Sequence, residues 1–380
     1  MTSTRLSEVR TQADADRLWE EIAESGAPLI EEDGHLVTFL WRDDGRTRNV
    51  VVVGGPARWD PLGADLMQRL PGTDVWHRSY HVEPPLIASY QLSVNDSLEA
   101  PDQITDWALR EFTFRADPLN PHGVDWPAHP SDLDQPARRT SILAAGAVMP
   151  ASPAGAGSLD EIRVTSELLG NTRTVWVHAP RDARDAQLLI VLDGWVWAQV
   201  LPISGPLEGI RAAGRPLVLA LVDSLDTGTR IRELEGNPDT TRFLVEELVP
   251  LLRTRYPVSG RIGVLGQSLG GLTAVAAALA APEVIAVAGA QSGSFWWPRD
   301  DADAPQEHLT ARVLAQQPVD VRICLEVGSY EGADMIDTAR RLHAALAVRG
   351  YDADHREHSG GHDWLRWWCD LPALVARMFA

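Results

Sequence analysis

The sequence predicts an α/β fold with a mostly parallel sheet, preceded by a small all-β domain. In the second half, strands that are apolar on both faces alternate with helical stretches, which favours a parallel sheet covered on both sides. In the first part, short strands separated by turn residues are typical of an antiparallel, immunoglobulin-like sandwich. The segment Ala144–Gly157 is rich in Ala, Gly and Pro and is expected to be a linker. We therefore assign residues 1–145 to the sandwich and residues 158–380 to the α/β domain.

The N-terminal domain is expected to begin with a helix and to continue with strands. Residues 12–24 place Leu18, Trp19 and Ile22 on one face of an amphipathic helix. The pattern then changes to short strands between turn signals such as Asp43-Asp44-Gly45. Strands are expected over residues 36–41, 49–53, 75–82 and 87–94.

The C-terminal domain is expected to open with a hairpin and to continue in βαβ order. The hairpin pairs residues 161–168 with residues 172–178 around a Gly170-Asn171 turn. Buried strands are expected over residues 188–192, 216–222, 261–265, 284–290 and 322–327. Helices are expected over residues 240–256, 269–281 and 334–349.

Charge and composition exclude several classes of function. The net charge of −19 argues against nucleic acid and anionic membranes, because both require a basic protein surface. No apolar run is long enough to span a bilayer, and Met1–Arg10 lacks the pattern of a secretion signal. Cys324 and Cys369 do not have a metal-ligand spacing and suit a reducing compartment. His355 and His358 would face opposite sides of a strand, which disfavours chelation. We therefore expect a cytoplasmic protein without a metal or cofactor.

A nucleophilic serine is expected at Ser268. The segment Gly266-Gln267-Ser268-Leu269-Gly270 lies between a buried strand and a helix. A serine on such a sharp turn is held in a strained conformation with its Oγ above the sheet edge, and glycines flank it because a Cβ there would clash. This pattern is the nucleophile elbow of the α/β-hydrolase fold, and it predicts a serine esterase.

The base and the acid of such a site follow the serine in the chain. His362, in a glycine-flanked loop before the last helix, is the expected base. The acid should follow the strand over residues 322–327, where Glu331 and Asp334 are candidates. Glu331 is preferred because it lies closer to the strand end, whereas Asp334 could cap the next helix.

Two backbone amides are expected to stabilise an oxyanion. The Leu269 N–H lies at the N-terminus of the helix that follows the serine. The second donor should come from the loop Asp193-Gly194-Trp195, which follows the strand over residues 188–192. The Trp195 N–H is the expected donor, and Gly194 would let the backbone approach the substrate.

The motifs along the chain resemble those of the enterochelin (ferric enterobactin) esterases, which are related to esterase D. The resemblance spans nearly the whole chain. In the C-terminal domain it rests on Asp193-Gly194-x-x-Trp197, Asp223-Ser224-x-Asp226, Arg230-x-x-Glu233-Leu234-x-x-Asn237, Gly266-Gln267-Ser268-x-Gly270-Gly271, Gln291-Ser292-Gly293-Ser294-Phe295-Trp296-Trp297-Pro298, Glu326-x-Gly328-x-x-Glu331 and Gly360-Gly361-His362-Asp363. In the N-terminal domain it rests on Gly72-Thr73-Asp74-Val75-Trp76 and Ala116-Asp117-Pro118-Leu119-Asn120-Pro121. The resemblance implies hydrolysis of the ester bonds of a ferric catecholate siderophore, a cyclic tri-ester of serine, with release of iron inside the cell.

The residues fit an aromatic, anionic substrate of this kind. Seven of the 14 tryptophans lie in three short segments that are expected to converge on one cleft. Flat catecholate rings stack on indoles, and an anion attracts Arg. Substrate-binding residues are therefore expected at Arg230, Trp197, Trp296 and Trp297. The alternative for Arg230 is an ion pair with Glu233 or Asp226.

The N-terminal domain departs from the resemblance at one place. The family often carries a basic residue in the strand before a Ser-Tyr pair, whereas Leu86-Ile87-Ala88-Ser89-Tyr90 has none. This domain is therefore expected to contribute less charge to the site or to recognise a different siderophore.

Two other functions remain open from the sequence. One is a general carboxylesterase or a feruloyl or acetyl esterase of carbohydrates with an accessory domain, which the lack of a secretion signal disfavours. The other is a siderophore-binding protein without turnover, which a base aimed at a serine disfavours. The expected partner is the ferric catecholate siderophore, a small molecule, with no nucleic acid or membrane partner, and the oligomeric state is not predicted.

Overall fold

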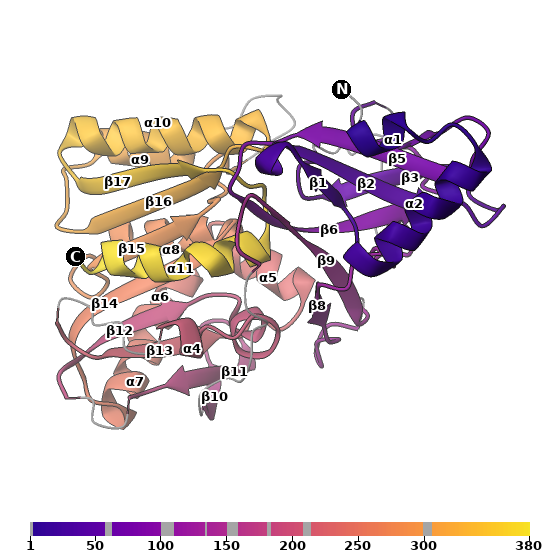
Figure 1. Ribbon diagram of the computed structural model, residues 1–380. Coiled ribbons are helices and arrows are strands. Elements are labelled where there is room, and N and C mark those ends of the chain that lie inside the picture. The colour runs from indigo at the N-terminus through magenta and orange to yellow at the C-terminus, as the bar shows by residue number, and fades with distance from the viewer. Residues whose placement is uncertain are drawn as a thin grey trace.

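The computed structural model describes the chain in eight stretches, which are residues 3–57, 63–99, 110–133, 135–149, 159–180, 184–207, 214–298 and 306–380. Figure 1 shows an N-terminal part made mainly of strands beside a larger part in which helices flank a sheet. The all-β N-terminal region and the α/β region predicted from the sequence are both confirmed. No helix in these stretches combines the length and the apolar character that crossing a bilayer requires.

Two antiparallel sheets form the N-terminal part. The first has the order β1 (Leu29–Glu31), β2 (Leu36–Arg42), β5 (Val75–His81) and β4 (Gln68–Arg69). The second has the order β3 (Val50–Gly54), β6 (Leu86–Val94), β9 (Arg138–Ala145) and β8 (Gly123–Trp126), with β7 (Phe114–Arg115) paired to β6. Phe39, Tyr90 and Leu143 are buried in one cluster that joins the two sheets, which makes this part a sandwich.

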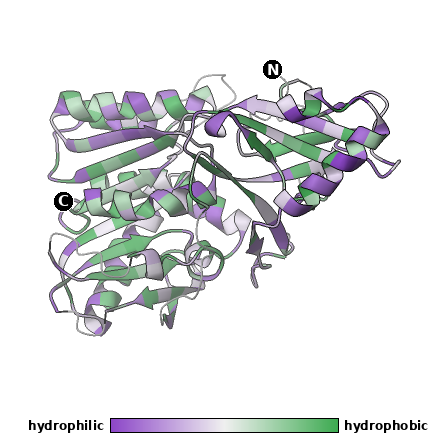
Figure 2. Cartoon of the chain, viewed as in Figure 1, coloured by the Kyte–Doolittle hydropathy of each residue, from purple (hydrophilic) through white to green (hydrophobic). Residues whose placement is uncertain are grey.

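Helices cover the outer face of the first sheet. They are α1 (Thr4–Ser7) and α2 (Gln12–Ser25), and a short 3-10 turn, η1 (Glu32–Gly34), follows β1. Leu18, Trp19 and Ile22 of α2 pack in one buried cluster with Leu40 and Val75 of the sheet. Figure 2 shows hydrophilic residues on the outward side of α2, so the predicted amphipathic helix is confirmed.

One sequence expectation about this part is wrong. The linker expected over Ala144–Gly157 begins inside a strand, because Ala144 and Ala145 belong to β9 and pair with β6. The remainder of that expected linker from residue 150 onward, and the expected start of the second domain at residue 158, lie outside the described residues. The long Pro- and Asp-rich region before it contains β7, β8 and much of β9.

A single sheet of eight strands forms the centre of the C-terminal part. Its order is β10 (Asp160–Ser166), β11 (Asn171–His178), β13 (Leu217–Val222), β12 (Ala186–Val191), β14 (Val258–Gln267), β15 (Val287–Gln291), β16 (Arg322–Gly328) and β17 (Asp352–His358). β11 pairs antiparallel with β10 and β13, and every neighbouring pair from β13 to β17 is parallel. The mostly parallel sheet is therefore confirmed.

Helices cover both faces of this sheet, which explains why its strands are apolar on both sides. One face carries η3 (Val196–Val200), α4 (Ser204–Leu207) and α11 (Trp364–Met378). The other carries α5 (Thr227–Leu234), α6 (Pro238–Arg242), η4 (Phe243–Leu248), α7 (Val249–Arg255), α8 (Leu269–Ala280), α9 (His308–Ala315) and α10 (Ala333–Arg349). Along β12, Leu188 and Ile190 join the cluster of α7 and α8, whereas Leu189 and Val191 join that of α11.

Candidate active site

Ser268 occupies the sharp turn between β14 and α8. Its φ of 57° and ψ of −120° fall in a region that residues with a side chain rarely adopt. A Cβ on Gly266 would lie 2.2 Å from the carbonyl carbon of Gly270, so only glycine fits at position 266. A Cβ on Gly270 would meet nothing closer than 3.5 Å, so the clash expected on both sides of the serine is wrong at Gly270.

His362 and Glu331 come from the loops after β17 and β16 and meet at the carboxyl end of the sheet. His362 Nδ1 lies 2.8 Å from Glu331 Oε2. The other carboxylate oxygen accepts hydrogen bonds from the Gly328 N–H at 2.9 Å and the Ser292 hydroxyl at 2.5 Å. Burial alone would raise the pKa of Glu331, but these hydrogen bonds, with that from His362 the largest, bring the pKa below its ordinary value.

Asp334 is the other candidate acid. It is exposed in the first turn of α10. The N-cap residue of α10 is Gly332, so Asp334 does not cap the helix as the sequence suggested. Of the two candidates, it is Glu331 that contacts the imidazole.

Ser268 and His362 line one cavity of about 320 Å³. Ser268 Oγ lies 3.3 Å from Ser294 Oγ, and no hydrogen bond joins Ser268 to His362 in the described part of the chain. A hydrogen bond between nucleophile and base often tightens only when substrate is bound. Among the described residues, no group of three or more His, Cys, Asp or Glu side chains could hold a metal ion. The cavity therefore offers a hydroxyl and a carboxylate-held imidazole to the same ligand.

The two amides expected to bind an oxyanion both lie at helix starts. Leu269 is the first residue of α8, so its N–H has no acceptor within the helix. Trp195 precedes η3 as its N-cap and lines the same cavity as Ser268. A Cβ on Gly194 would lie 2.4 Å from the carbonyl carbon of Leu221. Close packing against β13 therefore requires glycine at this position, and the expected approach of a substrate to Gly194 stays a prediction.

Arg230 lines the cavity, but its guanidinium is paired with Asp193. The distances are 2.7 Å from Nε to Oδ1 and 2.8 Å from Nη2 to Oδ2. Burial alone would lower the pKa of Arg230, and the attraction of Asp193 outweighs it and raises the pKa. Arg230 therefore forms an ion pair, as the alternative expected, but its partner is Asp193. Of the two expected partners, Glu233 pairs with Arg173 and Asp226 caps α5.

The three tryptophans expected to bind substrate do not line the cavity. Trp197 is fully buried in the core on the α11 face, so that expectation is wrong. Trp296 donates its indole N–H to Met335 Sδ. Trp297 covers Gly236, where an added Cβ would lie 2.3 Å from the indole ring. Trp296 and Trp297 therefore do not line the cavity, although Ser294 of the same segment lies beside Ser268.

Other tryptophans line the cavity instead. They are Trp126, Trp195, Trp364 and Trp367. Trp367 packs edge-on against the His362 ring with centroids 4.8 Å apart, and its indole N–H donates to Ser292 Oγ at 3.0 Å. Trp367 thus contacts the imidazole and a serine that holds Glu331.

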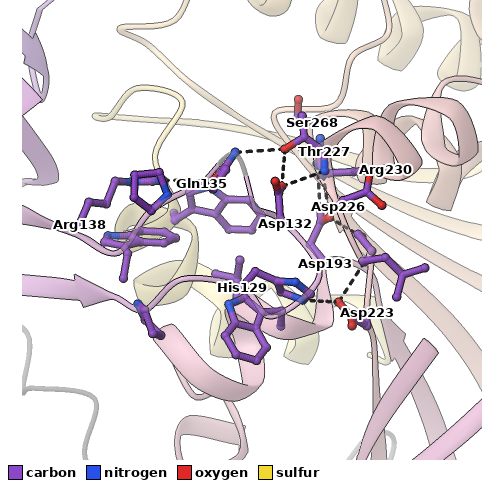
Figure 3. Close-up of a pocket in the computed structure, with 18 of the residues that line it drawn as sticks. His129, Asp132, Gln135, Arg138, Asp193, Asp223, Asp226, Thr227, Arg230 and Ser268 are labelled. Carbon is purple, nitrogen blue, oxygen red and sulfur yellow. Dashed lines mark hydrogen bonds and ion pairs between the residues drawn. The ribbon is translucent and has the colours of Figure 1, made fainter. Parts of the chain in front are cut away.

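Sequence reasoning missed a segment of the N-terminal part that reaches the cavity. It runs from β8 to β9 and contributes Trp126 to the lining. It also contributes His129, Asp132, Gln135 and Arg138, which Figure 3 labels. Thr227 anchors this segment to α5, because its N–H and hydroxyl donate to Asp132 at 2.9 and 2.8 Å. The segment is rich in Pro and Asp, which is typical of a loop, and the pair of Trp126 and His129 is a signal that could have indicated a site there.

The sandwich also holds the two loops of the His–Glu pair. The Ser89 N–H donates to Asp363 at 2.9 Å, and the Ser89 hydroxyl donates to the same oxygen. The Glu83 N–H donates to the Tyr330 hydroxyl at 2.8 Å, and the Ser359 hydroxyl donates to the Glu83 carbonyl at 2.5 Å. Asp363 and Tyr330 directly adjoin the histidine and the glutamate, so the N-terminal part fixes both loops.

Comparisons with known families support this architecture. A family model described as "Putative esterase" matches residues 166–378, and one described as "Enterochelin esterase, N-terminal" matches residues 36–150. The iron(III) enterobactin esterase of Dickeya dadantii is 33% identical to this chain over 398 residues, which cover 94% of this chain and 91% of the relative.

Solved structures agree with the sequence matches. The ferric enterobactin esterase of Salmonella typhimurium is 28% identical with a TM-score of 0.78, covering 96% of this chain and 98% of the other. The enterobactin esterase of Shigella flexneri, crystallised in the presence of enterobactin, is 29% identical with a TM-score of 0.71, covering 90% and 92%. The fold and the matches define a carboxylic ester hydrolase of the α/β-hydrolase type. The chain belongs to the enterochelin esterase family.

Proposed function

We propose that this chain hydrolyses the ester bonds of a ferric catecholate siderophore, a cyclic tri-ester such as enterobactin. The observation that carries the proposal is the 2.8 Å contact between His362 and Glu331 at a cavity that Ser268 also lines. A histidine held by a buried carboxylate beside a serine on an elbow suits acyl transfer. The similarity to iron(III) enterobactin esterases over most of the chain supports the choice of substrate.

In the proposed reaction, His362 acts through Nε2, since Glu331 holds Nδ1. Nε2 takes the proton of Ser268 Oγ as that oxygen attacks the ester carbonyl carbon, and the proton then passes to the leaving alcohol. The tetrahedral oxyanion accepts hydrogen bonds from the Leu269 and Trp195 N–H groups. Water, deprotonated by His362, attacks the acyl-enzyme, releases the acid and restores Ser268. Glu331 stays ionised and stabilises the imidazolium.

The walls of the cavity support an aromatic substrate. Four indoles line it, those of Trp126, Trp195, Trp364 and Trp367. Flat catecholate rings stack on such surfaces, whereas a small aliphatic ester would use little of them. The reaction is proposed to take place in the cytoplasm, and both cysteines being free thiols supports a reducing compartment.

Product analysis tests the proposal. The protein is incubated with a ferric tri-catecholate lactone, with its iron-free form and with p-nitrophenyl acetate, and the products are separated by chromatography. We expect the ferric lactone to be opened to linear and single-arm products at a higher kcat/KM than the acetate is cleaved. Rapid cleavage of the acetate with the lactone left intact would show a general carboxylesterase instead.

A further inference from the structure

A second cavity adjoins the first on the side of the N-terminal sandwich. It has a volume of about 300 Å³ and shares five lining residues with the first cavity. The shared residues are Trp126, Pro136, Arg138, His362 and Trp364. The second cavity therefore lies directly beside the imidazole, with a wall of aromatic rings and one guanidinium between the two spaces.

Aromatic side chains of the sandwich line the second cavity. Phe112 and Phe114 lie around it, together with Trp126 and Trp364 of the shared wall, whereas the Tyr90 ring is buried in the sandwich core. Phe112 is 73% exposed, which leaves a large hydrophobic ring uncovered at the cavity. Because aromatic rings stack on one another, this cavity suits an aryl group.

Arg138 lies in the wall shared by the two cavities, and its guanidinium can bind an anionic ligand there. Its guanidinium carbon lies 5.0 Å from the centroid of the Trp126 ring, and its Nη1 donates to Gln135 Oε1 at 3.1 Å. Burial lowers the pKa of Arg138, and the attraction of Glu111, which lines the second cavity, partly offsets this effect. Within the described stretches, no carboxylate forms an ion pair with Arg138. A guanidinium stacked on an indole in this way can still donate to an anionic oxygen.

The charges of the first cavity direct an anion towards Arg138. Four carboxylates line that cavity, and they are Asp132, Asp193, Asp223 and Asp226. Arg230 and Asp193 neutralise each other, so Asp132, Asp223 and Asp226 supply the negative charge of that side. Figure 3 shows Arg138 and Arg230 on opposite sides of the cavity. An anionic arm is therefore repelled from the aspartate side and attracted to the wall shared with the second cavity.

We propose that the second cavity binds a second aryl arm of the tri-ester while the ester of the first arm lies at Ser268, and that Arg138 recognises the catecholate oxygens between the two arms. The inference rests on the proposed function. Catecholates diverge from the iron that they share, so a cation in the wall between two cavities can reach oxygens of both arms. The sandwich thus supplies charge from β9, although residues 86–90 of β6 carry no basic side chain.

The test compares Arg138→Ala with the matched control Arg139→Ala. Arg139 follows in the same strand, lines neither cavity, and is paired with Asp125 at 2.7 Å. The substrates are the ferric tri-catecholate lactone and the methyl ester of a single dihydroxybenzoyl-serine. Loss of a charge-assisted hydrogen bond should lower kcat/KM for the lactone about tenfold to a hundredfold, with a clearly smaller loss for the single-arm ester. Arg138→Lys should recover part of the loss, and Arg139→Ala should behave as wild type.

A second variant keeps the test decisive if Arg138→Ala folds poorly. Phe112→Ala removes an exposed ring from the second cavity alone and should also lower kcat/KM selectively for the lactone. Equal losses on both substrates, or a lactone unaffected by Phe112→Ala, would overturn the assignment of the second cavity. A wild-type protein that cleaves the single-arm ester but leaves the lactone closed would overturn the proposed function together with this inference.

Discussion

Replacement of Arg230 by alanine should slow the chemical step and destabilise the fold, rather than only weaken the binding of an anionic substrate. Both oxygens of Asp193 are paired with this guanidinium, at 2.7 and 2.8 Å. Asp193 Oδ2 would lie 3.5 Å from a Cβ on Gly270, and Asp193 is two residues before Trp195. Without Arg230, a fixed negative charge would therefore face the place where the oxyanion is proposed to form.

The size of the effect follows from the burial of the pair. Removing one partner of a buried ion pair costs about 3–5 kcal/mol, because the other charge is left without compensation. Asp193 is 4% exposed, but Arg230 is 23% exposed, so water can replace part of the lost guanidinium. We expect a loss near the lower limit, about 3 kcal/mol of unfolding free energy, and a fall in kcat of at least about tenfold.

The assays are urea unfolding and steady-state kinetics on p-nitrophenyl acetate and the ferric lactone. The double variant Arg230→Ala/Asp193→Asn removes the uncompensated charge and should recover part of both the stability and kcat. If Arg230→Ala instead raised KM for the lactone alone, with kcat and stability unchanged, the guanidinium would serve the substrate and the reasoning from Asp193 would be refuted.

Three further variants test the site. Ser268→Ala should abolish hydrolysis while equilibrium binding of the ferric lactone, followed by tryptophan fluorescence, stays within about twofold of wild type; residual turnover at the wild-type rate would exclude this serine as the nucleophile. Glu331→Gln should lower kcat by about two to four orders of magnitude, because the imidazole loses its anchor. In the folded state the pKa of Glu331 is below its ordinary 4.5. The ionised carboxylate therefore contributes to stability above pH 4.5, and this contribution is lost as the pH falls through the folded-state pKa. Acid unfolding curves of wild type and Glu331→Gln should then converge below the folded-state pKa. Ser89→Ala removes one donor to the buried Asp363 carboxylate. In denaturant unfolding the variant should lose about 1.5–3 kcal/mol of unfolding free energy, and its kcat should fall because Asp363 adjoins His362. Unchanged stability and unchanged kcat would argue against the interdomain contact.

Much of the fold could be predicted because local sequence encodes it. The buried strands read as apolar runs since helices cover both faces of the sheet, as the division of Leu188 and Leu189 between two cores shows. The nucleophile elbow could be predicted because its sharp turn leaves no room for a Cβ at position 266, so the sequence carries a glycine there. The order of serine, acid and histidine along the chain narrowed the acid to Glu331 or Asp334.

By itself, the sequence determined the α/β class, the all-β N-terminal region, the elbow at Ser268 and the family, because each depends on periodicity or on motifs of neighbouring residues. The tertiary structure decided which side chains face the cavity. In the tertiary structure Trp197 is buried and Arg230 is paired with Asp193. Glu331 contacts His362. Arg138 of the sandwich lines the site. These outcomes depend on packing between segments far apart in the chain, and residue type alone does not distinguish an indole in the core from one that lines a pocket.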